Sequence, residues 1–141
     1  MMQIRLAEIF DVPELNKLNI LFNGEGCSSI KIIEESLKNN AREIVVVADE
    51  EDRLVGFCCG QIFKSVCYSY NYSEITELYI MKEYRRKGIG KQLIDFMETE
   101  FIKRGVKHIH ILTGKDNKIA QSLYHLCGYI ETSEILLDKD L

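Results

Sequence analysis

The 141-residue sequence contains no tryptophan and only one proline, Pro13, and it has no apolar run long enough for a membrane-spanning helix. Basic residues do not predominate either: 18 Lys and Arg stand against 22 Asp and Glu, a formal net charge of −4. A general nucleic-acid binder needs a basic surface to neutralise phosphates, so we expect neither a nucleic-acid nor a membrane partner. The first residues also lack the basic-then-apolar pattern of a secretory signal.

The cysteines do not form a disulfide pattern. There are five of them, an odd number without regular spacing and without a CxxC pair. Cys58 and Cys59 are neighbours in an apolar run, where they would point to opposite faces of a strand. We therefore expect reduced cysteines that serve as small core residues in a cytoplasmic protein, and no structural zinc site.

What the sequence does have is the composition of an ordinary globular domain, with 46% apolar and 28% charged residues. A chain of this length buries roughly two thirds of the surface that its unfolded form exposes, which is enough for one core. No linker, repeat or low-complexity tract divides it. We expect a single domain over residues 1–141, and the sequence leaves open whether it is a monomer or a homodimer.

Hydrophobic periodicity and turn residues predict the element order β-α-α-β-β-β-α-β-α-β. Capping signals mark helix starts, among them Asp11 with Glu14 three residues later, Ser28 or Ser29, and Asp116 or Asn117. The order predicts a mixed α/β (α+β) domain with one central, mostly antiparallel, twisted sheet flanked by about four helices. The expected strands cover residues 3–6, 43–48, 54–63, 74–81, 108–113 and 135–137.

The most informative segment joins a strand to a long helix and reads Arg85-Arg86-Lys87-Gly88-Ile89-Gly90-Lys91. Glycines at a helix start let backbone N–H groups approach a ligand, and the first-turn N–H groups have no partner inside the helix. Four basic side chains stand at the same place in an acidic chain. The arrangement indicates a phosphate or pyrophosphate site, and a basic first turn with merely solvated charges is the alternative.

Two known phosphate-binding motifs do not fit this segment. A P-loop needs four residues between its glycine and Gly-Lys-Ser/Thr, and here Lys91 is followed by Gln92. A dinucleotide fingerprint needs a third glycine where Leu93 stands and an acidic residue at the end of the next strand, which ends at Thr113.

The segment from Glu77 to Gly90 resembles the strand–R-x-x-G-x-G–helix motif of the GCN5-related N-acetyltransferase superfamily, and the resemblance covers nearly the whole chain. Asn117, Tyr124 and Gly128-Tyr129 match a later segment of the same family. The resemblance implies an acetyl-CoA-dependent N-acetyltransferase. In that reaction a primary amine of a small molecule, such as an amine, an amino sugar or an aminoglycoside-like compound, attacks the thioester directly.

The resemblance also implies which residues bind acetyl-CoA. A backbone N–H near Tyr79 or Ile80 would stabilise the oxyanion. Asn117 would hydrogen-bond the pantetheine arm, cap its helix, or do both. The expected cofactor-binding residues are Leu78, Tyr79, Ile80, Arg85, Arg86, Lys87, Gly88, Ile89, Gly90, Lys91 and Asn117.

Three further side chains are candidates for catalysis. Tyr124 matches the acid that protonates the departing thiolate, although the apolar stripe of its helix equally suits a core aromatic. Glu74 and Glu77 are candidate bases for the amine. Because they are three residues apart on one strand, they face opposite sides unless a bulge intervenes.

The acceptor side is less determined. Glu25, in the loop between the first two helices, would attract a cationic amine or is an ordinary surface residue. His108 and His110 share a strand face but lack a third ligand, so no metal site is expected. The acceptor loops, residues 22–30 and 64–73, carry no specific motif.

Two other functions stay open. One is acetylation of a protein N-terminus or lysine, and the other is a CoA-binding sensor or interaction module without turnover. The sequence does not name the acceptor, and it does not establish that the acyl group is strictly acetyl.

Overall fold

The computed structural model describes all 141 residues and contains a five-stranded sheet in the order β1-β2-β3-β4-β5. Neighbouring strands from β1 to β4 pair antiparallel, and β5 runs parallel to β4. The predicted mixed, mostly antiparallel sheet is confirmed. The strands are β1 (Met2–Leu6), β2 (Glu43–Glu50), β3 (Arg53–Phe63), β4 (Asn71–Ile80) and β5 (Val106–Ile111).

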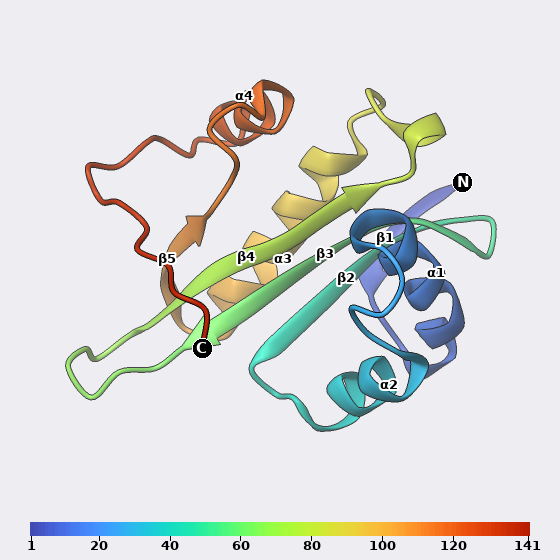
Figure 1. Ribbon diagram of the computed structural model, residues 1–141, viewed down its shortest axis with the longest axis horizontal. Helices are drawn as coiled ribbons and strands as arrows, with labels where there is room; N and C mark the ends of the chain where they lie inside the picture. Colours follow the sequence, from blue (N-terminus) through green and yellow to red (C-terminus); the bar gives the residue numbers. More distant parts are fainter.

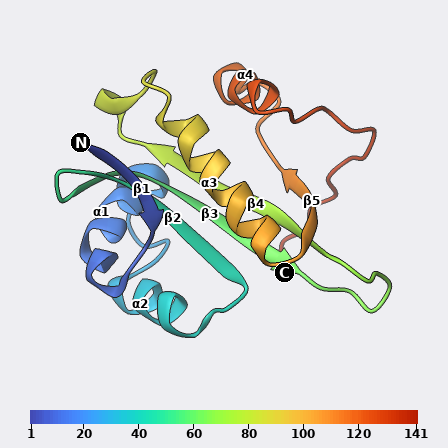
Figure 2. The same ribbon diagram turned by 180° about the vertical axis from the view of Figure 1, so that it is seen from behind.

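Helices cover both faces of the sheet. Helices α1 and α2 lie over β2 and β3 on one face (Figure 1), and α3 crosses the opposite face, as the view from behind shows (Figure 2). Helix α4 lies at the end of the sheet near β5. None of these helices has the length and apolar character that crossing a membrane requires. Their bounds are α1 (Val12–Asn23), α2 (Ile30–Asn39), α3 (Ile89–Lys103) and α4 (Lys118–Leu126), with short 3-10 turns η1 (Ile9–Asp11) and η2 (Lys82–Tyr84).

The core has two layers, one on each face of the sheet. The layer under α3 includes Leu93, Met97 and Phe101, all fully buried. The layer under α1 includes Leu15 and Phe57. Strands β2 and β3 have continuous apolar runs because both of their faces are covered.

Helix α3 packs closely against β3 at a position that has no side chain. A Cβ atom at Gly60 would lie 2.5 Å from Cζ of Phe101 and 2.8 Å from Sδ of Met97. Glycine usually weakens a strand, but here it provides the space in which the helix side chains lie.

The prediction of a last strand at residues 135–137 was wrong. The chain after α4 has no regular structure, and Ile135, Leu136 and Leu137 are 80%, 69% and 83% exposed. A strand needs a partner along its length, and this segment pairs with neither edge of the sheet. The apolar residues that suggested a strand are therefore exposed and do not contribute to the core.

The predicted cap of the first helix was also wrong in its chemistry. Asp11 precedes α1, but its carboxylate caps no N–H group of that helix. It accepts instead from the Arg5 guanidinium and from the Glu8 N–H at 2.7 Å. The Glu14 carboxylate, expected in a capping box, accepts from the Leu54 N–H at 2.6 Å and so ties α1 to β3.

Candidate active site

A bulge at Thr76 sets the direction of the glutamates on β4. Cys59 pairs with Glu77, whereas the next residue of β3 pairs with Ile75, so Thr76 stands opposite no residue. An extra residue shifts the alternation of side chains by one. Glu74 and Glu77 consequently lie on the same face of the sheet, the face that α1 and α2 cover.

Strands β4 and β5 pair over only part of β4. The register begins at Asn71 opposite Val106 and ends at Ile75 opposite Ile111, and beyond this point the two strands diverge (Figure 1). The second half of β4 therefore has a neighbouring strand only on its β3 side. We refer to the space between the diverging parts of β4 and β5 as the gap. Helix α4 lies at its open end.

The backbone of β4 offers hydrogen-bonding groups to this gap. The Met81 N–H donates to the Val55 carbonyl of β3 at 2.8 Å. Backbone groups alternate sides along an antiparallel ladder, so Tyr79 also points to β3, and Leu78 and Ile80 point to the gap. Of the two N–H donors expected from the sequence, Ile80 faces the gap, together with Leu78.

The glycine turn begins α3 without a side-chain cap. Gly88 is the N-cap, in the left-handed conformation at φ 81° and ψ 5°, and no side chain accepts from the N–H groups of the first turn. A Cβ atom at Gly88 would meet no other atom within 4 Å, so the space before the helix is open. Uncapped N–H groups at a helix start bind anions.

The basic side chains of the turn differ in what they contact. Arg85 donates from Nε to the Ile80 carbonyl at 2.8 Å, and its guanidinium lies 5.6 Å from the centre of the Tyr79 ring. Lys91 pairs with Asp95 at 2.7 Å on the exposed side of α3. Arg86 is exposed and forms no ion pair with a carboxylate. Arg85 thus fixes the turn to β4, and Arg86 remains available to a ligand.

The other residues of the turn have structural contacts. Ile89 and Gly90 are buried, and a Cβ atom at Gly90 would lie 2.9 Å from Cδ2 of Leu123 on α4. The Lys87 ammonium lies 5.4 Å from the centre of the Tyr84 ring. Gly90 is therefore needed for the contact between α3 and α4.

Two predicted residues belong to helix α4 and its N-terminal cap. Asn117 caps the helix, since its Oδ1 accepts from the Ala120 N–H at 3.2 Å. Tyr124 is partly buried against the core layer under α3. Burial is the main cause that raises the pKa of Tyr124, with the thiols of Cys58 and Cys127 adding to it. The phenol therefore stays protonated at neutral pH.

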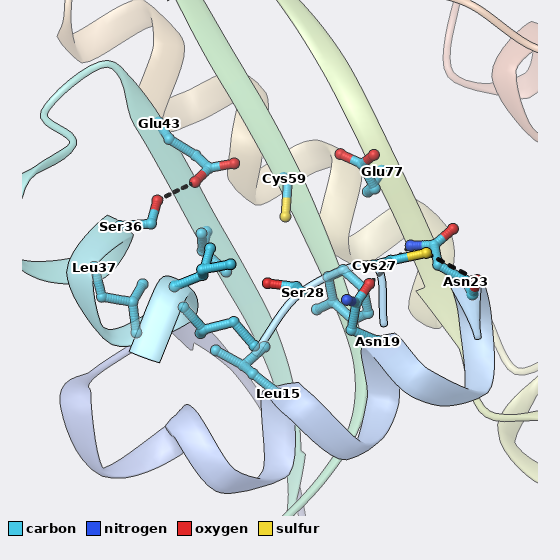
Figure 3. A pocket seen from close by; sticks show the side chains of 14 residues that line it. Leu15, Asn19, Asn23, Cys27, Ser28, Ser36, Leu37, Glu43, Cys59 and Glu77 are labelled. Atoms are coloured by element: carbon cyan, nitrogen blue, oxygen red, sulfur yellow. Dashed lines mark hydrogen bonds between the residues drawn. The ribbon is translucent and has the colours of Figure 1, made fainter. Parts of the chain in front are cut away.

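A cavity of about 410 Å³ opens between α1, α2 and the strands β2, β3 and β4. Figure 3 shows Glu43 of β2 and Glu77 of β4 at opposite sides of it, with Cys59 of β3 between them. No Lys, Arg or His is among the lining residues. The polar lining residues are Asn19, Asn23, Cys27, Ser28, Ser36, Glu43, Cys59 and Glu77.

The two carboxylates make the cavity electrically negative. Glu43 accepts from two neutral donors, Ser36 Oγ at 2.5 Å and Gln61 Nε2 at 3.2 Å. Burial, followed by the charge of Glu43 and with a smaller effect of Glu77, raises the pKa of the Cys59 thiol well above its ordinary value. A thiol with a high pKa is a poor nucleophile, so Cys59 forms part of the wall.

The structure brings together only part of the acceptor site that the sequence suggested. Glu77 lines the cavity, whereas Glu74 and Glu25 do not, and loop residues 22–30 contribute to the lining while residues 64–73 do not. Sequence reasoning missed Glu43, which was treated as the first residue of a buried strand. A carboxylate at the start of an otherwise apolar strand was the signal that could have identified it.

The chain was compared with protein families and curated sequences. A family model described as the acetyltransferase (GNAT) family matches residues 11–129. An uncharacterized N-acetyltransferase of Chlorobaculum tepidum is 29% identical over 110 residues, which cover 78% of this chain and 66% of that protein. The chain spans 39% to 66% of the length of four curated N-acetyltransferases that it matches.

Solved structures share the fold at low sequence identity. An aminoglycoside acetyltransferase from an uncultured soil metagenomic sample, in complex with trehalose, has a TM-score of 0.86 at 20% identity, covering 99% of this chain and 96% of its own. The ribosomal-protein-alanine N-acetyltransferase of Brucella melitensis biovar Abortus 2308 has a TM-score of 0.81 at 17% identity, covering 99% of this chain and 100% of its own. Their names assign them different acceptors, so the shared fold does not select one. Because the family match extends over most of its length, the chain belongs to the acetyltransferase (GNAT) family, whose acyl donor is acetyl-CoA.

Proposed function

We propose that this chain is an acetyl-CoA-dependent N-acetyltransferase that acetylates a primary amine of a small cationic molecule. The observation that carries the proposal is the position of Glu77. Its side chain lines the acidic cavity, and the backbone of the next residue, Leu78, faces the gap between β4 and β5. An acyl donor in the gap and an amine in the cavity would meet at these two residues.

The gap and the glycine turn fit the donor. The unpaired edge of β4 at Leu78 offers an N–H and a carbonyl to the amides of a pantetheine arm. The uncapped start of α3 at Gly88 offers N–H groups to a pyrophosphate, and the exposed Arg86 suits a further phosphate. The amide nitrogen of Asn117 remains available to the arm, because only Oδ1 of this side chain caps α4. Acetyl-CoA bound there supplies the thioester.

Three groups of the protein act in the transfer: one accepts a proton, one stabilises the developing negative charge, and one donates a proton. The ammonium form of the acceptor first loses one proton to solvent, which frees the nitrogen lone pair. Glu77 then accepts, directly or through a water molecule, the second proton that the nitrogen loses as it forms the new C–N bond. The Leu78 N–H donates to the carbonyl oxygen on which negative charge develops. As the C–S bond breaks, the phenol of Tyr124 protonates the thiolate. The products are the acetylated amine, which is an amide, and free CoA thiol.

The cavity supports a small-molecule acceptor. Its volume of about 410 Å³ lies in the range of small-ligand sites, and its wall combines apolar side chains with polar groups. A negative lining without a cation favours a positively charged guest. The aminoglycoside acetyltransferase among the structural neighbours is consistent with this choice.

The test is thiol release from acetyl-CoA over a panel of small amines, amino sugars, aminoglycosides and peptides. We expect turnover that depends on a small cationic primary amine and is absent with the corresponding alcohol. A clear preference for peptides would favour a protein acetyltransferase. Tight binding of acetyl-CoA without turnover on the whole panel would favour the sensor function.

Replacement of Tyr124 by Phe separates the enzyme from the sensor more sharply. Tyr124→Phe keeps the ring and its packing, so acetyl-CoA should still raise the melting temperature of the variant. Turnover should fall by roughly 10²- to 10⁴-fold, the usual contribution of general acid–base catalysis. Turnover close to that of the wild type would contradict the role of the phenol and leave water as the proton donor.

A further inference from the structure

The cavity contains two carboxylates, although one reacting amine requires only one of them. Glu77 borders the gap, whereas Glu43 lies on β2, two strands away. Adjacent strands are ~4.8 Å apart, so the backbones of β2 and β4 are separated by ~10 Å. Glu43 is also two residues along β2 from Val45, which stands at the level of Cys59 and Glu77. The two carboxylates therefore lie at opposite sides of the cavity (Figure 3).

Neither carboxylate has a cationic partner within the protein. The hydrogen bonds of Glu43 come from a hydroxyl and an amide, and neither Glu43 nor Glu77 takes part in an ion pair. Partly enclosed carboxylates without a counter-ion are costly, and a cationic ligand would remove that cost. Cys59 lies between the two carboxylates in the cavity wall (Figure 3), and both charges add to the effect of burial in raising the pKa of its thiol.

The wall between the carboxylates is largely apolar. Leu15, Ile33, Val45 and Phe57 line it, together with the un-ionised thiol of Cys59. A ligand that matches this pattern has positive charge at each end and a hydrocarbon chain or ring between. On the basis of the proposed function, we infer that the acceptor is a diamine, whose reacting amine lies beside Glu77 and whose second ammonium group is bound by Glu43.

The hydrogen bonds of Glu43 suit a binding role. Ser36 and Gln61 each donate to one of its oxygens, which fixes the carboxylate and leaves lone pairs for an ammonium group. Glu77 makes no hydrogen bond to another side chain and stands next to the gap, as a proton acceptor should. Glu43 thereby determines which amine is acetylated, and Glu77 accepts its proton.

The test compares kcat/KM for linear α,ω-diaminoalkanes of four to eight carbons with kcat/KM for the n-alkylmonoamines of equal length. The wild type should prefer the diamine of best length by about 10- to 100-fold, the range of a charge-assisted hydrogen bond. Glu43→Gln should lower this ratio to near one. Glu35→Gln removes the same charge from the exposed side of α2, outside the cavity lining, and should keep the wild-type ratio.

Further outcomes distinguish this inference from the proposed function. Equal use of diamines and monoamines by the wild type, or a preference that survives Glu43→Gln, overturns the inference and leaves the N-acetyltransferase in place. Absence of turnover with every amine contradicts the proposed function. The inference is then tested by calorimetry, as the ratio of the binding affinity of each diamine to that of the monoamine of equal length. If Glu43→Gln does not fold, Ser36→Ala removes one hydrogen bond that fixes the carboxylate and should shift the ratio in the same direction.

Discussion

At position 88, the effect of a substitution on backbone conformation can be distinguished from its effect on ligand binding. Gly88 has a φ of 81°, which disfavours most side chains, yet a Cβ atom there would meet no other atom. Asn and Asp both tolerate this conformation, and they have the same shape but different charge. Substitution by each of them therefore isolates the effect of charge on anion binding.

We expect Gly88→Asp to abolish the rise in melting temperature that acetyl-CoA causes, because a carboxylate would stand before the N–H groups proposed to bind the pyrophosphate. Gly88→Asn should keep a reduced rise. The measurement is a thermal melt of each variant with and without acetyl-CoA. Equal shifts for the two variants would show that the anion binds elsewhere.

Single residues also show the limit of what could be predicted from the sequence. The spacing of Arg85, Gly88 and Gly90 is local, and it located the glycine turn at the start of α3 correctly. The direction of Glu74 and Glu77 depends on the bulge at Thr76, which exists only because β3 pairs with β4 in two registers. Alternation along one strand contains no information about that shift.

At the scale of elements, Arg5 joins three segments of the chain. From β1 its guanidinium contacts Asp11 of η1 at 2.8 Å and Asp49 of β2 at 3.0 Å. Both aspartates are buried, and Oδ1 of Asp49 has no hydrogen-bond partner. The hydrogen bonds that Arg5 donates to Asp11 and, with a smaller effect, to Asp49 raise the pKa of Arg5, which keeps it charged. The cluster holds the edge strand and the entry to α1 on the sheet.

We expect Arg5→Met to lower the free energy of unfolding by about 2 to 4 kcal/mol, because two buried carboxylates would lose their counter-ion. Urea denaturation measures this as a midpoint lowered by about 1 M or more. The control is Lys17→Met on the exposed side of α1, which should change stability by no more than about 0.5 kcal/mol. An Arg5→Met midpoint equal to that of the control would show that the cluster contributes little.

Elements were predictable where their signals are local. Ser29 and Asn117 cap α2 and α4 as expected, since a cap depends on residues within one turn. The carboxylate of Asp11 was misassigned because the guanidinium of Arg5 on another element binds it. The strand expected at residues 135–137 failed for a related reason: strand formation requires a distant partner, and an apolar triplet does not provide one.

At the scale of the whole molecule, the cysteines report which surfaces are closed. Cys27 and Cys67 are exposed, whereas Cys58 is buried and Cys59 lies in the cavity wall. Burial raises the pKa of both the Cys58 and the Cys59 thiols. Because a raised pKa lowers the thiolate fraction at any given pH, these two thiols react slowly even when a reagent reaches them.

We expect iodoacetamide at pH 8 to alkylate Cys27 and Cys67 in the native protein while Cys58 and Cys59 stay unmodified. In urea all five cysteines should react, which serves as the control. Peptide mass spectrometry after timed quenching identifies the sites. Modification of Cys59 as fast as that of Cys67, which is exposed and lies outside the cavity, would mean that the cavity wall opens readily to solvent.

The two halves of the site differed in how far the sequence revealed them. The proposed donor half consists of consecutive residues from Leu78 to Lys91 with Asn117 and Tyr124, so a short motif is enough to predict it. The acceptor half is assembled from α1, α2, β2, β3 and β4. Glu43 and Glu77 are 34 positions apart and come together only through sheet pairing, so no local pattern could join them.

This separation has an evolutionary consequence. Nearly all of the cavity lining precedes residue 60, and the proposed donor side follows residue 77. If the cavity binds the acceptor as proposed, substitutions in the first part of the chain can alter which amine is accepted without disturbing the glycine turn. Glu77 is the one lining residue in the later part of the chain, so a substitution there would affect both the acceptor cavity and the adjacent donor side. A lineage could change its substrate repeatedly in the N-terminal region while keeping one unaltered acetyl donor site.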